Sequence, residues 1–160
     1  MKSTHPIYAS WPERLLAYLI DLFIIMLPVG MIAKPYIHEN SDGMVVVEPE
    51  AYVVIFLVNL CYHTYFIASR AQATPGMRML SIYVAHTTTR PLTMSDALQR
   101  FLAFFIPRLP SGASFISDAQ KPAIYVFLMI VWFAPILFRR DRAGMHDQLC
   151  STVVLARARG

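Results

Sequence analysis

Three long apolar runs dominate the pattern of hydrophobic and polar positions along the chain. They cover residues 15–33, 51–68 and 122–138, and only the first contains a charged residue, Asp21. An α-helix needs about 20 predominantly apolar residues to cross the hydrocarbon core of a bilayer. Each run therefore predicts a membrane-spanning helix.

A fourth apolar segment, residues 97–116, is interrupted by two arginines and two prolines. Its pattern fits a short kinked span, a re-entrant segment or an interfacial helix. Charge decides among them, because cytoplasmic loops collect Lys and Arg. The loop 34–50 has one Lys against four acidic residues and should lie outside, whereas residues 69–96 and the arginine-rich tail should lie in the cytoplasm. An even number of crossings must separate these two, so we expect four membrane segments, the third short and kinked, with both termini cytoplasmic.

Two short runs rich in β-branched residues, 79–85 and 151–156, are too short to cross a membrane. Each follows a turn region that contains glycine, which predicts a strand. We expect the two strands to pair and so to tie the cytoplasmic loop to the tail. In the outer loop, residues 40–43 read Asn-Ser-Asp-Gly and predict a turn.

Together these elements predict a single domain, residues 1–160, with an all-α membrane fold. We expect a small helical bundle of four membrane segments with a two-stranded cytoplasmic β element. A length of 160 residues suits one domain, and no internal repeat is evident in the sequence. Residues 1–13 hold one Lys, and no clean small-residue cleavage site follows the first apolar run, so we expect an uncleaved signal anchor.

The composition strengthens the membrane interpretation. Hydrophobic residues make up 56% of the chain and charged residues 15%, with a mean hydropathy of +0.47, whereas soluble chains average about 25% charged residues. This composition excludes a disordered chain, a collagen-like chain and an ordinary cytosolic enzyme. The net charge of +4 divides into −3 on the loop 34–50 and +7 elsewhere, which indicates orientation in a membrane rather than binding to nucleic acid.

Asp21 is the most informative polar residue, because a charge at the bilayer centre costs about 2.5–3.5 kcal/mol on insertion scales. Arg14, Tyr18 and Asp21 share one helix face, but a rise of about 10 Å separates Arg14 from Asp21. We therefore expect its partner on another segment, the candidates being Asn59, His63, Arg100, Arg142, His146 and Asp147. Asp21 is then either a buried hydrogen-bond acceptor that fixes helix packing or a carrier of a proton or cation.

The sequence contains no pattern that indicates a cofactor, a metal or a catalytic nucleophile. The five histidines lack ligand spacing, and Cys61 and Cys150 do not form a C-x-x-C pair. Glycine-rich phosphate loops and a G-x-S-x-G motif are absent from the sequence as well. We therefore expect a protein that is not an enzyme and needs no cofactor or metal.

Three separated motifs carry a family resemblance. The first runs from Trp11 to Asp21, the second from Ala73 to Leu80, and the third from Arg139 to Asp147, followed by Thr-Val-Val-Leu. In this order they resemble the RDD family of bacterial membrane proteins, which is named for an arginine and two aspartates. The resemblance implies that Arg14 is the family arginine and that Asp21 and Asp147 are the two aspartates, with Asp141 as the alternative to Asp147.

The resemblance also implies a multi-pass protein of the bacterial inner membrane. Some members of the family are reported as monovalent-cation/proton antiporters. The turn Thr74-Pro75-Gly76 matches a family element, but Met77 stands where the family usually has lysine, and Arg78 follows it. Because this departure removes a cation, we interpret the turn as structural rather than as a phosphate site.

Two functions remain open at this point. In the first, Asp21 exchanges a proton for a monovalent cation, Arg14 tunes its pKa and Asp147 acts as a cytoplasmic relay. Four segments are few for alternating access within one chain, so this function requires a homo-oligomer or another membrane partner. In the second, Arg14, Asp21 and Asp147 form a packing lock in an accessory module that binds lipid or a partner protein.

Overall fold

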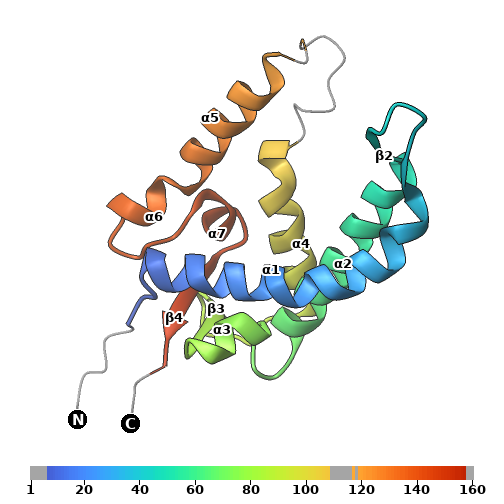
Figure 1. Ribbon diagram of the computed structural model, residues 1–160. Helices are drawn as coiled ribbons and strands as arrows, with labels where there is room; N and C mark the ends of the chain where they lie inside the picture. The colour runs from blue at the N-terminus through green and yellow to red at the C-terminus, as the bar shows by residue number, and fades with distance from the viewer. Residues whose placement is uncertain (1–6, 109–116, 118, 158–160) are drawn as a thin grey trace, which may run out of the picture.

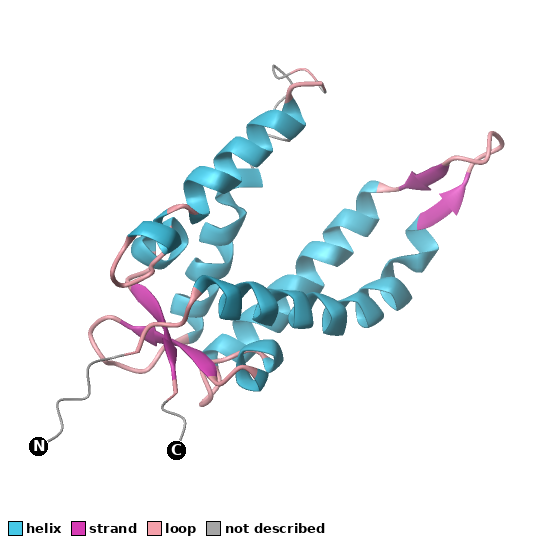
Figure 2. Ribbon diagram, turned by 60° about the vertical axis from the view of Figure 1, so that its left-hand side comes forward, coloured by secondary structure: helices cyan, strands magenta, loops and turns pink. Residues whose placement is uncertain are grey.

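The computed structural model describes residues 7–108, 117 and 119–157 (Figure 1). Its helices and strands divide the molecule into a membrane part and a smaller sheet-containing end. Both ends of the described chain lie beside the strands β3 and β4, whereas the hairpin β1–β2 lies at the far end of the helices (Figure 2). This separation gives the molecule two distinct ends along its helix axes.

Among the described residues, three helices are long and apolar enough to cross a membrane. They are α1 (Trp11–Ala33), α2 (Pro49–Ala68) and α5 (Lys121–Phe133), and α5 is continued by the short helix α6 (Pro135–Phe138). With their extensions the spans are Trp11–Tyr36, Pro49–Ala68 and Lys121–Phe138, with mean hydropathies of 2.4, 1.6 and 1.9. The predictions for residues 15–33, 51–68 and 122–138 are thus confirmed as apolar helices of spanning length.

The fourth predicted segment gives a shorter helix. Helix α4 (Met94–Phe105) has 12 residues and is not among the candidate spans of the described residues. It begins at Thr93, whose side chain accepts a hydrogen bond from the backbone N–H of Asp96 while Asp96 bonds back to Thr93. This reciprocal cap fixes the start of the helix. Residues 109–116 of the predicted segment lie outside the described residues.

The loop between α1 and α2 contains a hairpin that the sequence analysis missed. After the short 3₁₀ helix η1 (Lys34–Tyr36), strands β1 (Ile37–Glu39) and β2 (Val45–Val47) pair in an antiparallel manner. The turn predicted at residues 40–43 is confirmed, since the N–H of Gly43 donates to the carbonyl of Asn40 over 3.1 Å. The three consecutive valines of β2 were the signal available in the sequence.

The strands predicted at residues 79–85 and 151–156 are present and pair with each other, although the first begins only at Ile82 because Met79 ends the helix that precedes it. Strands β3 (Ile82–His86) and β4 (Thr152–Ala156) run antiparallel, and Val84 lies opposite Val154 at the centre of the register. Each strand follows a five-residue helix, α3 (Pro75–Met79) before β3 and α7 (Met145–Leu149) before β4. The sheet and the helix segments around it bury the main apolar cluster of the molecule: Ala9, Ala17, Ile67, Ile82, Val84, Leu92, Ala97 and Val154.

The backbone repeats itself at a spacing of 70 residues, a structural repeat that sequence identity does not reveal. Gln72 and Arg142 both have positive φ, of 48° and 49°, and Ser81 and Ser151 have φ of 56° and 51°. Helices α3 and α7 lie between these positions, and β3 and β4 follow them with the same burial pattern. Val84 therefore pairs with its own counterpart, Val154, which places a local two-fold axis between them. The repeat is not visible in the sequence, because the two segments share their backbone conformation but few identical residues.

The repeat extends into the membrane helices. Helices α1 and α4 both begin with a reciprocal cap, formed by Ser10 with Glu13 and by Thr93 with Asp96. Helix α2 ends at Ala68 and α6 ends 70 residues later, at Phe138. We call α1–α2–α3–β3 the first half of the molecule and α4–α5–α6–α7–β4 the second half.

Candidate functional site

Asp21 is the centre of the first polar cluster, which we call the Asp21 cluster. Its side chain is buried, with 2% of the residue exposed. One carboxylate oxygen accepts hydrogen bonds from the Tyr62 hydroxyl over 2.7 Å and from the Gly76 N–H over 2.8 Å. The other accepts from the Thr74 hydroxyl over 2.5 Å. The cluster thus joins α1, α2 and the start of α3.

The turn before α3 is shaped to lie against α1. A Cβ atom on Gly76 would lie 2.3 Å from the carbonyl oxygen of Ala17, so only glycine allows this approach. Thr74 caps α3 by accepting from the N–H of Met77, and Pro75 occupies the first turn of the helix. The turn singled out in the sequence is therefore the element that supplies two of the three donors to Asp21.

Asp147 is the centre of the second polar cluster, the Asp147 cluster. It is completely buried in α7. One oxygen accepts from Arg14 over 2.9 Å and from the Gly144 N–H over 3.1 Å. The other accepts from Arg100, and Nε2 of His146 lies 3.3 Å from it. The cluster thus joins α1, α4 and α7.

The two arginines also reach the sheet. Arg100 donates to the Thr152 hydroxyl at the start of β4. Arg14 donates from Nε to the carbonyl of Ala9 over 3.3 Å and from Nη2 to that of Val154 over 3.5 Å. Since the N–H of Ala9 in turn donates to the carbonyl of Val154, the Asp147 cluster fastens the β3–β4 sheet to two helices.

The charges around Asp147 determine how it titrates. Burial alone would raise the pKa of the Asp147 carboxyl, but the positive charges of Arg100 and Arg14 outweigh it and lower the pKa to about 2. Burial lowers the pKa of the neighbouring His146 to about 4, against the attraction of Asp147. At neutral pH the cluster therefore holds an ionised carboxylate, two guanidinium groups and a neutral imidazole.

Among the described residues, none of the partners predicted for Asp21 donates a hydrogen bond to it. Asn59 donates to the carbonyl of Ile55 over 2.8 Å within its own helix, and the His63 ring stacks on Phe101 with centroids 6.0 Å apart. Arg100 and His146 belong to the Asp147 cluster instead. The sequence analysis missed Tyr62 because its hydroxyl is hidden in an apolar run, next to the more conspicuous His63.

The remaining singled-out residues lie at the edges of the two clusters. The Tyr18 ring lies 6.2 Å from that of Phe104, away from the bonds to Asp21. Arg142 donates to the carbonyl of Tyr8 over 3.5 Å. Arg78 donates to the carbonyl of Ala73 over 3.2 Å and lies over the Phe66 ring, so it supports the turn without binding Asp21.

The second half has an aromatic group where the first half has Asp21. Counted from the caps Ser10 and Thr93, the counterpart of Asp21 is Phe104, whose ring lies 5.7 Å from that of His146. His146 itself is 70 residues beyond Gly76. Within the residues that the structure describes, Nδ1 of His146 is buried without a hydrogen-bond partner. The two halves therefore share their backbone conformation but carry different side chains at these positions.

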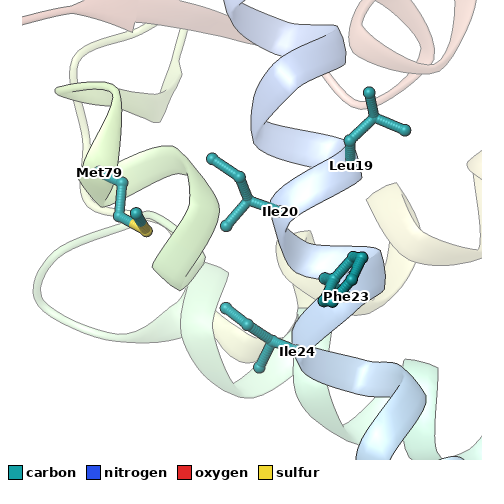
Figure 3. A pocket seen from close by; sticks show the side chains of 5 residues that line it. All are labelled: Leu19, Ile20, Phe23, Ile24 and Met79. Atoms are coloured by element: carbon teal, nitrogen blue, oxygen red, sulfur yellow. The ribbon is translucent and has the colours of Figure 1, made fainter.

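A shallow apolar pocket of about 400 Å³ lies on the outer face of α1 next to α3. Its lining consists of Leu19, Ile20, Phe23, Ile24 and Met79 (Figure 3). An apolar surface on a helix of spanning length is suited to contact with lipid chains. In the described part of the chain, no group of three or more His, Cys, Asp or Glu side chains is placed to hold a metal ion.

The comparisons with known proteins give one match. The family model of the RDD family matches residues 8–151, which is most of the chain and includes Arg14, Asp21 and Asp147. The comparisons with curated proteins and with solved structures give no match.

Proposed function

We propose that this chain, which belongs to the RDD family, is an accessory membrane module in which Arg14, Asp21 and Asp147 act as a packing lock. The single observation that carries the proposal is the burial of both carboxylates among hydrogen-bond donors. Each is at most 2% exposed and accepts three hydrogen bonds, which include donors from two other segments of the chain. Buried polar groups that are fully hydrogen-bonded stabilise one arrangement of the segments that carry them.

A carboxylate that carries ions must be able to exchange its partners. One of the donors to Asp21 is the backbone N–H of Gly76, which cannot turn away unless α3 leaves α1. A backbone N–H offers hydrogen and no lone pair, so it cannot help to coordinate a cation. These properties favour a packing role for Asp21 over an exchange role.

We further propose that residues 97–116 form a third, short membrane segment and that both termini lie on the cytoplasmic side of the inner membrane. The charge pattern supports this topology, because the acidic loop 34–50 surrounds the hairpin β1–β2 while the sheet end carries the arginines of the tail. Helix α4 packs along α2, a membrane-spanning helix, which supports its placement within the membrane part.

Monovalent-cation/proton exchange is the second candidate. It is favoured by the hydroxyl oxygens of Tyr62 and Thr74, which lie on the Asp21 carboxylate and would add oxygen ligands if the turn moved. Two structural repeats related by an axis along the membrane normal also occur in transporters. In this case the protein would work with a second copy or another membrane protein, because one chain supplies few segments.

The substitution Asp21→Asn separates the two candidates. In the packing role, the new amide NH₂ group would face the hydroxyl and N–H groups that donate to Asp21, and one hydrogen bond would be lost. The free energy of unfolding in detergent should therefore fall by about 1–3 kcal/mol. In the packing role, purified wild-type protein in liposomes should also give no proton-coupled Na⁺ or K⁺ flux above that of protein-free vesicles. The matched control is Asp42→Asn, an exposed aspartate in the turn of the hairpin.

The opposite result would favour exchange. A wild-type flux that Asp21→Asn abolishes, at an unchanged free energy of unfolding, would contradict the packing role. The control Asp42→Asn should leave both flux and stability at the wild-type level.

A further inference from the structure

The two halves meet along one well-packed pair of helices, α2 and α4. Aromatic rings fill this seam: Phe56 lies 5.6 Å from Phe101 and 5.3 Å from Phe105, and His63 stacks on Phe101 at 6.0 Å. Such ring pairs add stability beyond the area that they bury. We call these residues the α2–α4 seam.

The repeat assigns this seam a counterpart in a second pair of helices by residue spacing. Exchanging the halves turns α2 into α5 and α4 into α1, so the counterpart of the α2–α4 seam is an α1–α5 seam. By the spacing of 70 residues, Val126 and Phe133 correspond to Phe56 and His63. Counted from Ser10 and Thr93, Tyr18 and Leu22 correspond to Phe101 and Phe105. The rings of Tyr18 and Phe133 lie against Phe104 of α4, so the open part of the α1–α5 seam consists of Leu22, Val126 and the exposed side of Tyr18.

In the described part of the chain this second seam is not closed. Helix α1 packs on α2 and α3 but has no comparable packing on α5, and α5 diverges from α1 in both ribbon views (Figures 1 and 2). Tyr18, Leu22 and Val126 are 40%, 44% and 54% exposed. Two apolar helix faces of spanning length are therefore left for another apolar molecule to cover.

A polar pocket lies at the sheet end of the same two helices. It has a volume of about 260 Å³ and is lined by Tyr8, which precedes α1, and by Arg139, Arg140 and Asp141, which follow α6. Arg139 pairs with Asp141, and Arg142 donates to the carbonyl of Tyr8. Three arginines against one aspartate leave the mouth of the seam with an excess of two positive charges.

We propose that an anionic phospholipid occupies the α1–α5 seam, with its phosphate in the pocket beside Arg140 and its acyl chains on the exposed faces of α1 and α5. Charge and polarity argue for this occupant together, since the cationic pocket and the apolar faces are joined end to end. Arginines next to the cytoplasmic end of a membrane helix attract anionic lipid headgroups. The proposal rests on the accessory-module function and names the lipid class that the module binds.

The repeat supplies a matched pair of variants for the test. Arg140 and Arg70 are both exposed and occupy the same place in the two halves, 70 residues apart, but only Arg140 lines the pocket. Native mass spectrometry of the purified full chain in detergent would compare added phosphatidylglycerol with phosphatidylcholine of the same acyl chains. We expect preferential binding of phosphatidylglycerol, a loss of about fivefold in its affinity for Arg140→Ala, and no loss for Arg70→Ala. Equal losses in both variants, or equal binding of the two lipids, would overturn the proposal.

Two further arms separate the lipid from other occupants. Val126→Trp adds bulk to the α1–α5 seam and should weaken phosphatidylglycerol binding while inorganic phosphate fails to compete with the lipid. Unchanged binding in this variant, or competition by millimolar phosphate, would show that the acyl chains are not held there. Disulfide cross-linking between copies carrying Leu22→Cys and copies carrying Val126→Cys, with Cys61 and Cys150 replaced by serine, would place a second copy in the seam and overturn the proposal.

The test of the lipid site and the test of the packing role can fail separately. Loss of lipid preference with an intact effect of Asp21→Asn on unfolding would remove the lipid site alone. An absent effect of Asp21→Asn, with the lipid preference retained, would remove the packing role alone.

Discussion

Asp21 and Asp147 are both buried carboxylates with three hydrogen bonds, but their donors differ in kind. Asp21 is held by two hydroxyl groups and a backbone N–H, all of them neutral. Asp147 is held by two guanidinium groups and a backbone N–H, with a histidine beside it. The first cluster joins segments of one half of the repeat, whereas the second joins both halves and the sheet.

This difference teaches what each cluster contributes. Removing one partner from a buried ion pair leaves uncompensated charge, which costs more than a lost neutral hydrogen bond. The Asp147 cluster should therefore dominate the energetic connection between the halves. The Asp21 cluster depends instead on close approach of backbones, because two of its three donors lie on a turn that only glycine allows to reach α1.

The largest effect is expected for Asp147→Asn. This variant keeps the shape of the side chain but leaves Arg14 and Arg100 buried without a counter-charge, so the free energy of unfolding should fall by about 3–5 kcal/mol. Chemical unfolding of the purified protein in detergent, followed by circular dichroism, measures the change. The control is Asp141→Asn in the exposed pair with Arg139, where we expect less than about 1 kcal/mol. Equal effects at the two positions would remove the distinction between the clusters.

A smaller effect is expected for Gly76→Ala, which tests the backbone approach in the Asp21 cluster. The added Cβ would meet the carbonyl oxygen of Ala17 at 2.3 Å and the Asp21 carboxyl group at 2.9 Å. Overpacking of this kind costs about 1–3 kcal/mol, measured by the same unfolding experiment. Gly30→Ala in α1 is the control, because its Cβ would meet nothing within 4 Å and alanine favours a helix. A harmless Gly76→Ala would mean that α3 does not need to lie so close to α1.

The smallest effect is expected from mild acidification, which acts on the Asp147 cluster. The pKa of His146 is about 4 in the folded protein against an ordinary value of 6.5, so the unfolded chain takes up a proton first as pH falls. Stability should therefore decrease between pH 7 and pH 6, by less than about 1 kcal/mol, and further toward pH 4. Unfolding curves at each pH, compared with those of His146→Gln, isolate this contribution. A variant with the same pH profile as wild type would assign the effect to other groups.

Much of the membrane part could be predicted from the sequence, because apolar runs of spanning length have few alternatives. The strands β3 and β4 were predictable for a similar reason, since β-branched residues after a glycine-containing turn leave little choice. The partners of Asp21 could not be predicted, because Thr74 and Gly76 come close to α1 only when α3 docks. Arg14 belongs to the same case, since its position in the sequence points to Asp21 while the fold brings Asp147 to it.

The internal repeat lies beyond sequence patterns for a different reason. Four residues of the repeat have positive φ: Gln72, Ser81, Arg142 and Ser151. None is a glycine, so the sequence gives no sign of this backbone conformation. The two halves differ at the positions that would have made the repeat visible in the sequence, with Asp21 opposite Phe104 and Gly76 opposite His146. Backbone conformation was kept where chemistry was not.

The long separation between Arg14 and its counter-ion has a consequence for synthesis of the protein. The two residues are 133 positions apart, and ribosomes add about 5–20 residues per second. Arg14 is therefore synthesised on the order of ten seconds before Asp147. During that interval its charge must be accommodated by water and lipid headgroups. The first half lacks its ion pair with Asp147 until the last part of the tail has been made.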